Sequence, residues 1–124
     1  MKKWLASLVL LFMVSACSNQ DIITFQDRSE TWSVQYNVEV TGENEESTEL
    51  RIAYVGDGEP PETIDYSYDA GSGSGNGTAP LSEDGVITPS SGCSGCDTTE
   101  REDEVTVTIE WDDQEENFTL EPRS

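Results

Sequence analysis

The stretch Trp32-Ser33-Val34-Gln35-Tyr36-Asn37-Val38-Glu39-Val40 decides the fold, because apolar and polar residues alternate along it without a break. Successive side chains of a β-strand point to opposite faces of the sheet. The tryptophan, tyrosine and valines therefore share one face, and the polar residues share the face that meets water. This period of two predicts a half-buried antiparallel strand.

The same alternation recurs on the C-terminal side of this stretch, after turns rich in Gly, Pro and acidic residues. The further strands predicted from it are 50–54, 64–68, 86–87, 105–111 and 118–120. A sheet with one apolar face must be covered, so we predict an all-β fold: a small antiparallel β-sandwich of immunoglobulin-like or fibronectin-like shape, with about six to seven short strands. The inward aromatic residues are expected to fill the core rather than a ligand site.

The N-terminal residues 1–16 have the pattern of an export signal. Lys2 and Lys3 precede an uncharged apolar run from Trp4 to Val14, which as a helix rises only about 16 Å, too little to cross a hydrocarbon core of about 30 Å. Val14-Ser15-Ala16-Cys17 resembles the bacterial lipobox, which implies acylation of the Cys17 sulfur and cleavage just before it. The alternative is an ordinary secretory signal in which Cys17 is incidental.

The lipobox implies a mature protein on the outer face of the cytoplasmic membrane, held by acyl chains. We expect a cleaved lipoprotein signal peptide over 1–16, a lipidated N-terminus and tether over 17–31, and the β-sandwich domain over 32–124. Ile22 to Phe25 could instead pair as an edge strand, and the sequence favours neither reading.

Charge excludes several partners. The chain has 26 Asp and Glu against six Lys and Arg, a net charge of −20, so phosphate neutralisation and nucleic-acid binding are excluded. Removal of residues 1–16 takes both lysines and leaves four arginines against the 26 acids, a net charge of −22. Self-repulsion at this density predicts a fold that salt stabilises, as suits a saline or alkaline medium.

The composition also excludes most catalytic machinery. The chain has no His, which removes His-based nucleophile pairs and histidine metal sites. The mature chain has no Lys for a Schiff base, and carboxylate pairs are too common here to indicate an enzyme. We therefore expect no enzymatic activity and no cofactor. Asp57 with Glu59, and Asp112 with Asp113, lie in acid-bearing turns that are weak cation candidates, but neither has the spacing of a dedicated calcium loop.

Cys93 and Cys96 lie in a Gly- and Ser-rich segment, residues 90–96, that the sequence predicts to be a loop. Thiols outside the membrane tend to oxidise, so we favour a local disulfide between the two cysteines. A thioredoxin-like redox pair, a metal shared across a dimer and free thiols are the alternatives. The Gly/Ser segment from Ala70 to Thr78 is predicted to be a mobile loop.

The order of these motifs resembles a group of small uncharacterised lipoproteins of Bacillus-type Gram-positive bacteria. The motifs are the lipobox, the Ile52 to Gly56 segment, the Gly92 to Cys96 loop and the C-terminal hairpin that begins with Ile109-Glu110-Trp111. The resemblance carries over no catalytic or ligand residue. It implies a membrane-anchored protein on the outer face of the cytoplasmic membrane.

The function expected from these features is that of a monomeric, non-enzymatic envelope module. Its loops or a sheet edge would contact an envelope protein or a wall component, with the Gly/Ser segment and the Gly92 to Cys96 loop as the favoured surface. The alternative is a thiol-disulfide redox helper that uses Cys93 and Cys96.

Overall fold

The computed structural model describes residues 21–71, 73–95 and 97–123. These residues form nine strands: β1 (Asp21–Arg28), β2 (Trp32–Gly42), β3 (Glu45–Tyr54), β4 (Thr63–Asp69), β5 (Ser74–Pro80), β6 (Val86–Ile87), β7 (Ser90–Ser94), β8 (Val105–Trp111) and β9 (Gln114–Pro122). The all-β, antiparallel prediction is confirmed. The expected number of strands was too low, because β1, β5 and β7 form in segments that were predicted as a tether or as loops.

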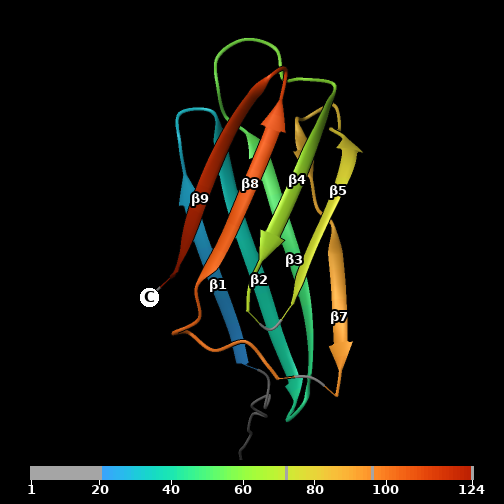
Figure 1. Ribbon diagram of the computed structural model, residues 1–124, viewed down its shortest axis with the longest axis vertical. Helices are drawn as coiled ribbons and strands as arrows, with labels where there is room; N and C mark the ends of the chain where they lie inside the picture. Colours follow the sequence, from blue (N-terminus) through green and yellow to red (C-terminus); the bar gives the residue numbers. More distant parts are fainter. Residues whose placement is uncertain (1–20, 72, 96, 124) are drawn as a thin grey trace, which may run out of the picture.

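The strands form one sheet in the order β5-β4-β8-β9-β1-β2-β3-β6, with β7 also paired to β3. The connection between β9 and β1 is only two residue pairs long, Phe25 with Pro122 and Gln26 with Glu121. The sheet turns at this narrow connection and curls nearly into a barrel (Figure 1), so that its apolar face is turned inward. A two-sheet immunoglobulin-like sandwich is not confirmed.

The core follows the alternation seen in the sequence. Trp32, Val34 and Val38 on β2 are fully buried, and Tyr36 is almost so. The Trp32 ring meets the Trp111 ring of β8 edge to face, with centroids 5.4 Å apart, and the Tyr54 ring of β3 at 5.3 Å. The contact between Trp32 and Trp111 connects the two halves of the curled sheet.

The segment 21–28, predicted as part of a tether, is an interior strand of the sheet. It pairs along its whole length with β2 and at two positions with β9. Ile23 and Phe25 point into the core, whereas Ile22 is exposed, which is the same period of two in a shorter and less regular form. The alternative prediction, that Ile22 to Phe25 pairs as a strand, is confirmed, but β1 is not an edge because it has a neighbour on both sides. Signal cleavage and acylation of Cys17 concern residues outside the described ranges.

The Gly/Ser segment predicted as a mobile loop contributes an ordered strand, β5, that pairs with β4. The glycines lie against the half-buried tyrosines of β4: a Cβ on Gly75 would come within 2.8 Å of the Tyr68 ring, and one on Gly77 within 2.9 Å of the Tyr66 hydroxyl. Because glycine has no side chain, the tyrosine rings can lie directly against the β5 backbone. The rings of Tyr66 and Tyr68 thus provide the apolar contacts that the side chains of β5 do not.

Replacement of Gly75 by Ala is expected to destabilise the fold by about 1–3 kcal/mol, because the Tyr68 ring must move to admit the methyl group. Gly73→Ala is the matched control, since a Cβ there would meet nothing within 4 Å. Urea denaturation of both variants measures the difference. Equal midpoints would show that the Tyr68 ring does not require a glycine at this position.

Burial of Tyr36 makes stability depend on alkaline pH. Burial, above all, raises the pKa of Tyr36 to about 12, whereas an unfolded tyrosine ionises near 10. The unfolded chain therefore loses its proton first, so the stabilisation is complete below pH 10 and is lost as pH rises towards 12. We expect a loss of about 2–3 kcal/mol over this window. The difference in melting temperature between the parent chain and Tyr36→Phe should be constant below pH 10 and should change between pH 10 and pH 12. A difference that stays constant up to pH 12 would contradict this prediction.

The described residues contain no helix with the length and apolarity needed to cross a bilayer.

Candidate binding site

The curled sheet has two ends, and β1 begins at one of them. β1 begins at Asp21 at one end and runs to the other, a length of about 25 Å for its eight residues. The β8–β9 hairpin lies at the far end, where the Ser29 hydroxyl donates to Glu116 over 2.7 Å (Figure 1). β1 therefore begins at the end opposite to this hairpin.

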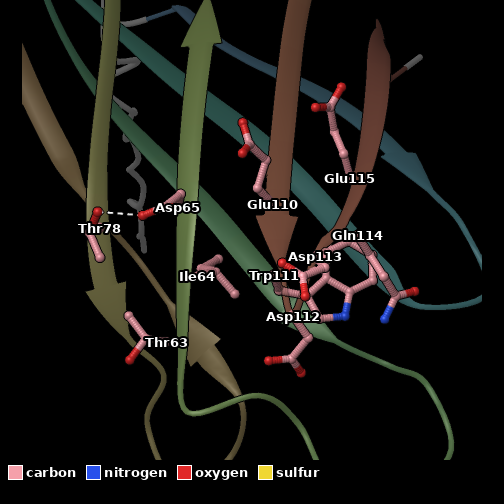
Figure 2. Close-up of a pocket in the computed structure, with 10 residues that line it drawn as sticks. All are labelled: Thr63, Ile64, Asp65, Thr78, Glu110, Trp111, Asp112, Asp113, Gln114 and Glu115. Carbon is pink, nitrogen blue, oxygen red and sulfur yellow. Dashed lines mark hydrogen bonds between the residues drawn. The ribbon is translucent and has the colours of Figure 1, made fainter.

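A surface hollow of about 540 Å³ lies at the hairpin end (Figure 2). Its lining comes from β4, β5, β8, β9 and the turn between the last two: Thr63, Ile64, Asp65, Thr78, Glu110, Trp111, Asp112, Asp113, Gln114 and Glu115. Five of these ten residues are carboxylates, and none of them is Lys or Arg. The hollow is therefore a strongly negative surface.

Three of the carboxylates form a row across neighbouring strands. Asp65 on β4 lies opposite Glu110 on β8, and Glu110 lies opposite Glu115 on β9. Figure 2 shows the three side chains on adjacent strands, with the Thr78 hydroxyl donating to Asp65. Like charges directly opposite each other in a sheet destabilise it. Repulsion among the three carboxylates therefore destabilises the sheet, and a bound positive charge would reduce this repulsion.

The neighbouring row on the same face is neutral. Ser67 lies opposite Thr108, which lies opposite Asn117, and the Thr108 hydroxyl donates to Asn117 Oδ1 over 2.7 Å. Negative charge is thus concentrated at the hairpin end of this face rather than spread evenly over it.

The hairpin turn adds two more charges in an unusual backbone conformation. Asp112 and Asp113 both have positive φ, 45° and 64°, and they are the two residues between the paired Trp111 and Gln114. Two-residue hairpin turns of this kind favour Asn-Gly, because the left-handed region is strained for residues with a Cβ. Below the turn, Trp111 is 8 % exposed and packs on Trp32, which gives the hollow a rigid base.

Replacement of the turn by Asn-Gly, in D112N/D113G, is expected to stabilise the protein by roughly 1 kcal/mol, because it removes both backbone strain and charge repulsion. The control E102Q/E104Q removes the same number of charges from exposed residues before β8 and should change stability less. Thermal unfolding at one salt concentration compares the two. A larger gain in the control would show that overall charge, rather than the turn, limits stability.

The structure places the two predicted pairs of cation-binding candidates in different parts of the surface. Asp112 and Asp113 join the hollow, whereas Asp57 and Glu59 lie in the exposed loop between β3 and β4 and do not line it. Among the described residues, no group of three or more His, Cys, Asp or Glu side chains has the arrangement of a metal site.

The cysteine segment is partly a strand. Cys93 lies on β7 opposite Glu46 of β3, so the loop predicted over 90–96 was wrong for residues 90–94. Cys96 lies outside the described residues, and the bond between the two cysteines stays a prediction. The thiol redox role also stays a prediction, although Cys93 lies on a strand rather than at the helix start typical of thioredoxin-like pairs.

The acidic row was not predicted from the sequence. Alternation places Asp65 and Glu110 on outward faces, whereas Glu115 was expected in the turn before the last strand. Only strand register brings the three opposite one another.

Comparison with known protein families, with characterised proteins and with solved structures finds no match to this chain. What the hollow can bind follows from its own chemistry: five carboxylates favour cationic groups such as lysine or arginine side chains or polyamines.

Proposed function

We propose that this protein is a lipid-anchored, non-enzymatic binding module on the outer face of the cytoplasmic membrane. Its acidic hollow holds a positively charged group of an envelope protein or wall component. The observation that carries the proposal is the row formed by Asp65, Glu110 and Glu115 beside the two-aspartate turn. Such an arrangement is unfavourable in the free protein and favourable around a cation.

The anchor and the hollow are compatible in geometry. Only three residues separate Cys17 from Asp21, so an acyl group on Cys17 would hold the start of β1 within about 14 Å of the lipid attachment point. The hairpin end would then face away from the bilayer and into the envelope. In this proposal the protein is a monomer, and the curled sheet is a sandwich-like scaffold of immunoglobulin type.

The anchor is tested by mass spectrometry of the mature protein and by fractionation of cells that express Cys17→Ser. We expect an acylated Cys17 as the first residue, and loss of membrane association in the variant. A different mature N-terminus, or a variant that remains on the membrane, would refute the anchor.

The hollow is tested with a flexible cationic probe, a peptide of four Gly-Lys repeats. Compared with the parent chain, D112N/D113N should weaken binding roughly tenfold, equivalent to about 1.4 kcal/mol. E102Q/E104Q has the same net charge and should weaken it no more than about twofold, because its substitutions lie outside the hollow. Equal losses in the two variants would mean diffuse attraction by the whole protein and would contradict the proposal.

Cross-linking on intact cells then identifies the natural partner. A photoreactive residue at Gln114, in the hollow, should capture a partner that the same residue at Glu102 does not. Capture at Glu102 alone would place the contact surface elsewhere on the protein.

A further inference from the structure

The two longest uncharged stretches of the mature chain are residues 70–82 and 85–96. They contain β5 and β7, which are outer strands of the curled sheet. Proteins usually protect such edges with charged side chains against pairing with other chains. None of the 26 acidic residues of this chain lies on β5 or β7. The edges of these two strands are therefore not protected by charge against pairing with a strand of another chain.

The outer edge of β5 offers backbone groups for a further strand. The Ala70 N–H donates to the Gly73 carbonyl and the Leu81 N–H to the Glu62 carbonyl, which identifies the hydrogen-bonded pairs of the β4–β5 ladder. Since these pairs alternate along an antiparallel ladder, Gly75 and Gly77 bond to β4. The exposed residues between them turn their N–H and C=O groups outward: Ser74, Asn76 and Thr78. Among the described strands, only β4 pairs with β5.

The two faces beside this edge differ in chemistry. On the inner face, the half-buried rings of Tyr66 and Tyr68 lie against the glycines of β5. The Tyr68 ring packs on the Tyr36 ring of β2, with centroids 5.6 Å apart, so its ring is held in place. On the outer face, Asp65 and Asp69 are exposed one strand away from the edge.

The edge is also continuous with the acidic hollow. Thr78 lies on β5 and lines the hollow, so a chain that runs along this edge passes beside the hollow at Thr78. The edge and the hollow can therefore act as one binding surface.

We propose that the outer edge of β5 binds an extended segment of a partner protein as an added antiparallel strand. The segment has Lys or Arg at alternate positions facing Asp65 and Asp69, and apolar residues between them packing on Tyr66 and Tyr68. This inference rests on the proposed binding role and specifies the partner. Backbone pairing supplies affinity, and the alternating side chains supply specificity.

The probe is a capped peptide of four Val-Lys repeats, in two N-methylated forms of identical charge. A peptide residue opposite Asn76 exchanges both backbone hydrogen bonds with it, and its side chain lies on the same outer face as that of Asn76. The lysines occupy these positions, so the lysine amides are those that bond to β5. N-methylation of the lysine amides should abolish binding, at least a tenfold loss, whereas N-methylation of the valine amides should be tolerated. Equal binding of both forms would overturn the proposal.

The protein side is tested with Asn76→Pro, which removes an outward N–H but none of the bonds to β4. Gly75 is the preceding residue and tolerates the proline. We expect at least a tenfold loss of peptide affinity, with Asn76→Ala close to the parent chain and unfolding midpoints confirming both folds. Binding should slow amide exchange at Asn76 and Thr78. If Asn76→Pro binds as well as Asn76→Ala, the edge is not the site.

Two other occupants of the edge give different results. Concentration-dependent dimers that Asn76→Pro abolishes would show a second copy at the edge and overturn the proposal. Amides of β5 that are already protected in the free protein would show that the edge is closed, with the same consequence. Failure here is distinct from failure of the hollow, because D112N/D113N changes the hollow and leaves β5 unaltered, whereas Asn76→Pro and the N-methylated peptides change only strand pairing.

Discussion

Trp32→Ala is expected to lower the free energy of unfolding by about 3–5 kcal/mol, enough to leave the domain largely unfolded at low salt. Trp32 is 0 % exposed and its ring packs on Trp111 and Tyr54. Truncation would leave a large cavity where the two halves of the curled sheet meet. Far-ultraviolet circular dichroism and urea denaturation measure the loss, which added salt should partly offset by screening the acidic residues.

Trp32→Phe separates packing from hydrogen bonding. The Trp32 indole N–H is buried, and it has no hydrogen-bond partner among the described residues. Phenylalanine removes this unsatisfied donor and keeps an aromatic ring, so we expect a much smaller loss than in Trp32→Ala. If the two variants were equally unstable, the edge-to-face packing would not be the main contribution of Trp32.

Glu46→Ala is expected to destabilise the protein by about 2–3 kcal/mol. Glu46 is 5 % exposed, and its carboxylate accepts hydrogen bonds from the Thr99 backbone N–H at 2.6 Å and from the Thr99 hydroxyl at 2.9 Å. Thr99 is itself buried, so the substitution removes both of these bonds inside the protein. Urea denaturation should show the loss, and amide exchange at Thr99 should become faster.

Two neighbouring variants make this test specific. Glu45→Ala removes an adjacent exposed carboxylate and should have little effect, since repulsion among the acids also decreases. Glu46→Gln keeps one acceptor oxygen and should fall between the two. An effect of Glu46→Ala no larger than that of Glu45→Ala would mean that the contact with Thr99 does not hold segment 97–103 on the barrel.

The errors of the sequence-based prediction occurred where a strand depends on other strands. β5 has almost no apolar side chains, and it is ordered because Tyr66 and Tyr68 lie against its glycines. β1 shows only a brief alternation, and it is an interior strand because β2 and β9 pair with it. Neither cause is visible within the segment itself, so local patterns indicated a loop for β5 and left a tether and an edge strand equally open for β1.

Local alternation was sufficient to establish the all-β class and the inward face of the long strands, because side-chain direction repeats every two residues within one strand. The absence of His and the net charge of −20 are also properties of the sequence alone, and from them we expect no histidine chemistry and no nucleic-acid partner. The acidic row of Asp65, Glu110 and Glu115, the edge of β5 and the Glu46–Thr99 contact arose only in the tertiary structure. They join residues 45 to 53 positions apart or on separate strands, and register and curvature, which no single segment encodes, decide which of these side chains meet.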